Sequence, residues 1–179
     1  MDILLIIFLV GVLAIAAVHD LRFQKIPNLL TYSSMGIALV YHGVMNGVGG
    51  VLFSAGGLAL GIGLFAIPYL MGGMGAGDAK LMGTVGAIVG AKGAFISFLF
   101  TAIIGGAYAL ILLLMSRHYL RGLIARSIVT LKTFVFTKQL IAIPAPKEER
   151  KPRLCYGVAI SLGTISYIVM QLSGHNFLV

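Results

Sequence analysis

The sequence predicts an all-α polytopic membrane protein of about six transmembrane helices, folded as a single membrane-embedded domain over residues 1–179. The first observation is composition: 59% of the residues are hydrophobic and 10% are charged, against roughly 25% charged residues in ordinary soluble domains. The second is continuity, because apolar segments recur from Ile3 to Leu172 without a polar block long enough for a soluble domain. The third is a one-sided distribution of basic residues, which is typical of multi-pass membrane proteins.

Hydropathy separates the apolar segments into spans, each predicted to be a helix. The first is interpreted as a retained span rather than a signal peptide, because Met1-Asp2 supplies no basic start and no clean cleavage site precedes Asp20. The second follows a Pro27-Asn28 pair, in which Asn28 is expected to cap the helix. The predicted spans are residues 3–18, 29–44, 51–71, 79–90, 93–115 and 154–172.

The fourth predicted span is too short to cross a bilayer alone. Residues 79–90 cover about 18 Å at the helical rise of ~1.5 Å per residue, whereas the hydrocarbon core is about 30 Å thick. The glycine-rich link 72–77 is therefore expected to dip into the membrane and line a wet cavity. Glycines within the spans are expected to let helices pack closely, and the sequence places them at Gly56, Gly57, Gly61, Gly63, Gly83, Gly86, Gly90, Gly105 and Gly106.

The longest polar stretch is the loop 116–153. Its first part, from Arg117 to Leu140, mixes basic and apolar residues and predicts an amphipathic segment on the inner membrane surface, anchored to anionic lipid. Its second part, residues 143–152, is a charged loop punctuated by prolines.

The basic residues predict the orientation of the chain. When the links alternate between the two sides, twelve of the thirteen basic residues fall on one side and only Lys92 on the other. By the positive-inside rule that side is cytoplasmic, with both termini outside. The formal charge of +8 thus reflects topology. No aromatic residues are interleaved with the basic ones, so no nucleic-acid partner is predicted.

Two of the five acidic residues stand out by their position. Asp2 lies at the outer terminus and Glu148 and Glu149 lie in the polar loop, whereas Asp20 and Asp78 lie at the membrane edge or within it. Their links share the cytoplasmic side, so the two carboxylates could meet. A close pair shares a proton: one carboxylate deprotonates a water and the other hydrogen-bonds a carbonyl oxygen. Neither role can be assigned to one residue, because such a pair titrates as a unit.

A structural alternative is that Asp78 caps the helix starting at Ala79 and that Asp20 ends the first span. Capping and catalysis are compatible.

A second alternative is a small proton-coupled transporter in which the two aspartates relay protons. It requires polar groups continuing toward the outer face, and beyond Asp78 the fourth span offers only Thr84. A third is a membrane scaffold that packs through its glycine faces.

Other kinds of catalytic site fit the sequence less well. The four histidines are spread over both sides of the membrane, so no zinc site is predicted. The single Cys155 has no partner for an internal disulfide and is interpreted as a small apolar residue near a helix start. No cofactor is predicted. The spans also contain serines without a nearby histidine base, expected to hydrogen-bond within helices: Ser33, Ser34, Ser54 and Ser97.

Three motifs resemble one family. Gly75-Ala76-Gly77-Asp78, followed by Ala79-Lys80-Leu81, is similar to the GxGD motif of intramembrane aspartic proteases. The stretch from Asp20 to Asn28, with basic residues before Ile-Pro-Asn, resembles the first-aspartate motif of bacterial type IV prepilin peptidases. Residues 154–160 with Gly163 are similar to the last-helix pattern of that family, and the resemblance runs over nearly the whole chain.

The resemblance implies an intramembrane aspartic endopeptidase in the bacterial inner membrane, with its active site facing the cytoplasm. It implies that Asp20 and Asp78 are the catalytic pair and that prepilins or pseudopilins, cut after a short basic leader, are the substrates. Membrane lipids are the other expected partners. The remaining motif residues carry over as a supporting active-site loop of Gly75, Gly77 and Lys80, and as substrate or packing contacts at Pro27, Asn28, Tyr156 and Gly157.

The chain also departs from the family pattern. Larger members carry an N-terminal extension with paired cysteines and methylate the new N-terminus, and neither feature is expected here. The resemblance is to the small peptidase-only form of tight-adherence (Flp-like) pilus systems. Cys155 stands where the family often has proline. The PAL motif of presenilins and signal peptide peptidases is absent.

Overall fold

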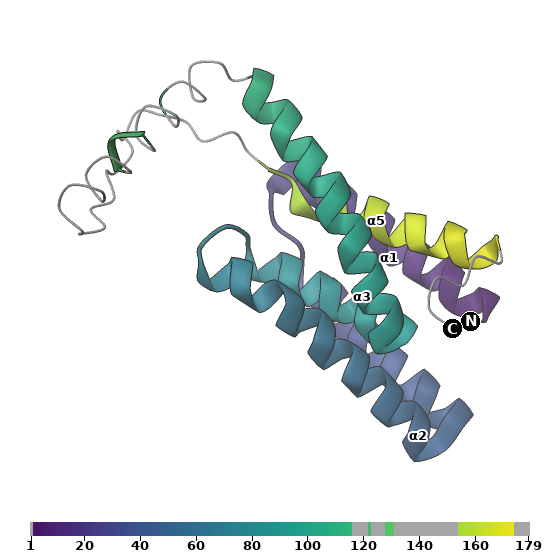
Figure 1. Cartoon of the computed structure of the whole chain (residues 1–179). Coiled ribbons are helices and arrows are strands. Elements are labelled where there is room, and N and C mark those ends of the chain that lie inside the picture. The colour runs from purple at the N-terminus through teal and green to yellow at the C-terminus, as the bar shows by residue number, and fades with distance from the viewer. Residues whose placement is uncertain (1, 116–121, 123–127, 131–153, 174–179) are drawn as a thin grey trace. The chain divides into compact units, whose positions relative to one another are not determined.

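The computed structural model describes residues 2–115, 122, 128–130 and 154–173, and in them every regular element is a helix. Three of these helices are long and apolar enough to cross a membrane, namely α1, α2 and α3, which confirms the all-helical membrane class. The predicted surface segment of the loop 116–153 lies almost entirely outside the described residues. The helices are α1 (Ile3–Phe23), α2 (Asn28–Leu70), α3 (Ala76–Met115) and α5 (Tyr156–Leu172) (Figure 1).

The two longest helices each consist of two helical segments that meet at a glycine. In α2 the break is Gly47, with φ 60° and ψ −145°, and in α3 it is Gly90, with φ 78° and ψ 176°. A positive φ of this kind strains any residue with a Cβ atom, so glycine is the residue that permits each break. The segments 28–46 and 48–70 correspond to the second and third predicted spans, and 76–89 and 91–115 to the fourth and fifth. The number of membrane crossings stays a prediction.

Two helix boundaries differ from the predicted ones in a way that matters for the acidic pair. Helix α1 continues to Phe23, so Asp20 lies inside the helix rather than beyond its end. Helix α3 begins at Ala76, so Asp78 lies in its first turn rather than in the preceding link. The glycines at 75 and 77 do not prevent helix formation, because tertiary contacts override weak intrinsic propensity.

The chain divides into two compact units, Met1–Gly106 with Cys155–Val179, and Ala107–Leu154. Both aspartates and all other predicted site residues belong to the first unit. The prediction of a single domain stays a prediction.

The first segment of α3 is the centre of the first unit, because residues 81–90 are all buried. It packs against the second segment of α2 through glycine. A Cβ atom on Gly57 would lie 2.8 Å from the carbonyl carbon of Gly90, and one on Gly61 would lie 2.9 Å from that of Met82. The predicted close packing is confirmed for these two glycines. It is wrong for others that face open space, namely Gly56, Gly63 and Gly106.

Close backbone approach also changes where polar side chains bond. Ser33 Oγ donates to the Leu29 carbonyl within its own helix at 2.6 Å, as predicted. Ser54 Oγ instead donates across the interface to the Ala87 carbonyl at 2.7 Å, because the glycine contact brings that carbonyl within reach. Ser97 Oγ is buried with no hydrogen-bond partner, so the prediction of bonding within a helix is wrong there too.

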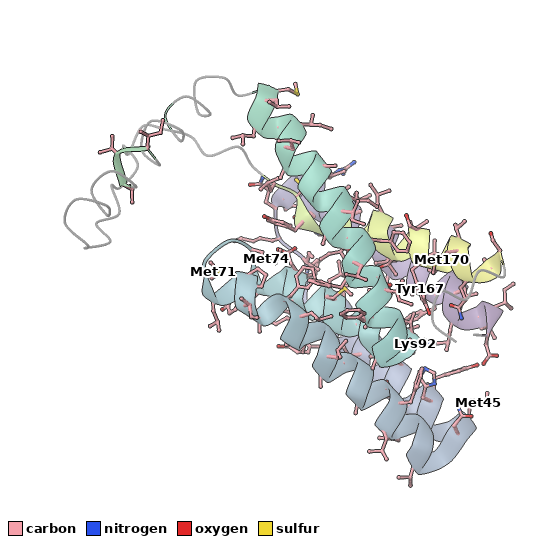
Figure 2. The ribbon with its side chains drawn as sticks, in the orientation of Figure 1. Met45, Met71, Met74, Lys92, Tyr167 and Met170 are labelled. Atoms are coloured by element: carbon pink, nitrogen blue, oxygen red, sulfur yellow. The ribbon has the colours of Figure 1, made fainter. Side chains whose placement is uncertain are left out.

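Helix α1 lies beside α5 (Figure 1), and Ser161 Oγ of α5 donates to the Leu13 carbonyl of α1 at 3.1 Å. The bundle has two distinct ends: Met71 and Met74 lie at one, and Met45 and Lys92 at the other (Figure 2). Tyr41 Oη donates to Asp2 at 2.7 Å. The two links that carry the aspartate motifs share the Met71 end.

Candidate active site

Asp20 is buried, with 6% of its surface exposed, and its carboxylate holds the start of another helix. Its Oδ2 accepts the Gly157 backbone N–H at 2.7 Å, and the carboxylate also accepts the N–H of Val158. These groups belong to the first turn of α5, where backbone N–H groups have no partner within the helix. Cys155, at the capping position, makes no side-chain cap. Asp20 therefore caps α5 from α1.

Gly157 makes this approach possible. A Cβ atom at this position would lie 2.9 Å from Asp20 Oδ2, closer than real Cβ contacts, and 3.0 Å from Asp20 Cβ, which is tighter than most of them. Any larger residue would displace the carboxylate. The sequence indicates Gly157 only through a motif, as a substrate or packing contact. The structure shows a specific one.

Asp78 is also buried, with 8% of its surface exposed, and also serves a helix start. Its Oδ2 accepts the Gly75 N–H at 3.0 Å, while its own N–H donates to the Gly75 carbonyl at 3.1 Å. An acidic side chain in the first turn that reaches back in this way is one half of a capping box. The capping alternative thus holds for Asp78, although the helix begins at Ala76 and not at Ala79.

Three helix ends meet at the candidate site: the C-terminal end of α1 and the N-terminal ends of α3 and α5. The carboxylates of Asp20 and Asp78 are close enough for their charges to interact. Both also interact with the Cys155 thiol, and Asp78 interacts with the Tyr156 hydroxyl. Two buried carboxylates in mutual range cannot both ionise without cost, so they suit acid and base roles.

Cys155 has a more specific position than sequence analysis expected. Its Sγ lies 3.9 Å from the Asp20 carbonyl oxygen and bonds to the Gln24 side chain. The thiol is buried. In the sequence, the feature that indicates this position is that Cys155 directly precedes Tyr156-Gly157. That feature indicates a contact with Asp20 only once α5 is known to pack on α1.

Lys80 and Asn28 are in direct contact. Lys80 Nζ donates to Asn28 Oδ1 at 2.9 Å and lies 4.8 Å from the centroid of the Tyr32 ring. The prediction that Asn28 caps the second span is wrong. Pro27 occupies the capping position of α2 and no side chain caps it, because the Asn28 amide oxygen is turned to Lys80.

The glycines of the 72–77 link have different roles. Gly72 has a φ of 71° and turns the chain between α2 and α3. Gly75 supplies the N–H that Asp78 accepts. Gly77 faces the link between α1 and α2: a Cβ atom on it would lie 3.2 Å from Ile26 Cβ.

The described residues contain no group of three or more His, Cys, Asp or Glu side chains arranged to hold a metal ion.

In a comparison with known families, residues 7–110 match the type IV leader peptidase family. No curated protein and no solved structure matches significantly. The matched residues include both aspartates, Asp20 and Asp78. They also include Lys80 and Asn28, which contact each other. They make up more than half of the chain, so the chain belongs to the type IV leader peptidase family, a family of membrane-embedded proteases.

Proposed function

We propose that the protein is an intramembrane aspartic endopeptidase that removes the leader peptide of prepilins or pseudopilins, with Asp20 and Asp78 as its catalytic pair. The observation that carries the proposal is that these two buried carboxylates, from separate helices, lie near enough for the charge of Asp20 to act on Asp78. Family membership supports the peptidase activity and the leader as the segment removed.

The helix starts hold the two carboxylates without using up their capacity to react. An ionised carboxylate has roughly four lone-pair sites. Asp20 uses some of these sites to accept the N–H groups of Gly157 and Val158. Asp78 accepts one from Gly75. The remaining sites can bind a water. The ionised carboxylate takes a proton from that water as it attacks the peptide carbonyl, and the protonated one donates to the carbonyl oxygen.

The substrate class follows from charge and from the family. A short basic leader is attracted by the two carboxylates, whereas the basic inner face of the protein repels it. The proposed active site faces the cytoplasm, since the links at the Met71 end carry Arg22, Lys25 and Lys80.

The test is cleavage of a co-expressed candidate prepilin, read as a gel shift. Asp20→Asn and Asp78→Asn should each abolish cleavage, because an amide neither takes the proton from water nor donates an acidic one. Asp2→Asn is the matched control: Asp2 is bonded to Tyr41 at the opposite end of the bundle, and the amide oxygen still accepts that bond.

Membrane abundance of each variant is measured alongside, so that loss of protein is not read as loss of chemistry. Full cleavage by either Asp20→Asn or Asp78→Asn at normal abundance would make that carboxylate a helix cap alone. The proton-relay alternative would then be the next to test.

A further inference from the structure

Lys80 is the charged side chain next along α3 from Asp78, yet it contacts two uncharged partners. Its ammonium donates to the amide oxygen of Asn28 and lies over the ring of Tyr32. Both partners belong to the first turns of α2. An ammonium between an amide and an aromatic face is held by hydrogen bonding and by the ring quadrupole. Lys80 therefore fastens α3 to α2.

The Lys80 contact lies two residues along α3 from Asp78 and is joined to Asp20 through the chain. The 24–27 link joins the end of α1, which carries Asp20, to Asn28. Within this link Ile26 packs on Gly77, whose Cβ position is 3.2 Å from Ile26 Cβ and 3.6 Å from Ile26 N. The contacts at Gly77 and at Lys80 thus hold the link and the start of α2 on either side of Asp78.

We propose that Lys80 is a positioning residue that, by binding Asn28 and Tyr32, holds the 24–27 link and the Asp20 end of α1 against the first turn of α3. It would thereby set the relative position of the two carboxylates. The proposal rests on the proposed function for its catalytic consequence. It does not place Lys80 on the substrate, since a basic leader would be repelled by the ammonium.

The first test reads the position of the link without any cleavage. Cys155 is the only cysteine and is 8% exposed, and Gln24 of the link bonds to its thiol. Lys80→Met keeps the length of the side chain but removes the charge, so it should release the link and speed alkylation of Cys155 by N-ethylmaleimide several-fold. An unchanged alkylation rate in Lys80→Met would overturn the proposal.

Two matched variants sharpen this measurement. Lys80→Arg retains a cation that can both donate to Asn28 and stack on Tyr32, so its alkylation rate should stay near that of the unaltered protein. Lys92→Met removes an exposed lysine at the opposite end of the bundle and should also leave the rate unchanged. Equal acceleration in Lys92→Met would assign the effect to lost charge in general and overturn the specific contact.

The second test separates positioning from substrate binding. Misplacing reacting groups by about 1 Å can cost roughly 100-fold in rate, so Lys80→Met should lower kcat by about tenfold or more while KM changes little. Lys80→Arg should restore most of kcat. A rise in KM at unchanged kcat would mean that Lys80 binds the substrate, contrary to the proposal.

Asn28→Leu removes the other half of the contact and should reproduce the kcat defect. Because the two residues act through one bond, the double variant with Lys80→Met should be no slower than the slower single variant. Multiplying defects would show independent roles and overturn the proposal. If the unaltered protein cleaves no prepilin, the proposed function fails, while the alkylation test still decides whether Lys80 holds the link.

Discussion

Gly157 and Asp20 show how one missing methyl group sets the position of a carboxylate. The Gly157 N–H lies 2.7 Å from Asp20 Oδ2, a short bond of the kind that an ionised acceptor makes. That bond requires the α1 side chain to lie directly on the α5 backbone, where a Cβ atom would stand 2.9 Å from the same oxygen. The position of the carboxylate therefore depends on a residue that contributes only backbone.

Gly157→Ala should lower kcat for prepilin cleavage by about 10-fold to 100-fold, because the added methyl displaces the Asp20 carboxylate. A displacement of about 1 Å can lower the rate roughly 100-fold. Cleavage kinetics at equal membrane abundance measure this. Gly11→Ala, in the same helix as Asp20 but facing open space, should leave kcat unchanged. Normal kcat in Gly157→Ala would show that the carboxylate tolerates displacement.

At the level of helices, neighbouring glycines of α2 have opposite environments. Gly57 faces the backbone of α3, whereas Gly56 has nothing within 4 Å of its Cβ position. Small residues allow membrane helices to approach closely and gain van der Waals contact. The interface between α2 and α3 then leaves no space for a side chain at Gly57. It also brings the Ser54 hydroxyl to the Ala87 carbonyl.

Gly57→Val should lower the free energy of unfolding by about 1–3 kcal/mol, the usual cost of overpacking, since the contact is with rigid backbone. Gly56→Val is the matched control and should be neutral or slightly stabilising, because valine has the higher helix propensity. Thermal unfolding of the two purified variants in one detergent gives the comparison. Equal losses of stability would mean that α2 and α3 are not packed through Gly57.

For the molecule as a whole, the two ends of the bundle differ in charge and in chemistry. The Met71 end carries the aspartate motifs and Lys80, and the opposite end carries Asp2, Tyr41 and Lys92. The positive-inside rule predicts that the first end faces the cytoplasm. On the proposed function, a leader cut before it crosses the membrane would meet the peptidase on that side.

Cysteine labelling measures this orientation in a Cys155→Ser background. A membrane-impermeant maleimide applied to cells with a permeable outer membrane should label Asn46→Cys, at the turn near Gly47, and not Lys25→Cys. Both positions are exposed, so both should react after lysis. The reverse pattern would place the candidate site outside the cytoplasm and contradict the proposed substrate route.

Much of the architecture could be predicted from local properties of the sequence, namely the hydropathy of each segment and the charge of each link. Hydropathy located the apolar segments to within a few residues, and the helical membrane class followed from them. Alternation of the links placed Asp20 and Asp78 at the same end, and the structure brings their carboxylates into mutual range. Each of these inferences needs only the composition of a window or the sign of a charge.

Contacts between distant segments were decided by tertiary structure alone. Asp20 and Gly157 are 137 residues apart in sequence, and nothing local indicates which helix start a buried carboxylate will cap. The same holds for Asn28: its place before an apolar segment predicts a helix cap, but its amide oxygen accepts a hydrogen bond from Lys80, 52 residues away. Hydropathy determines which segments are helices in a membrane, but only side-chain fit between helices determines which of them touch. The reason is that lipid tails are as apolar as the helix faces, so the hydrophobic effect favours no particular pair of helices.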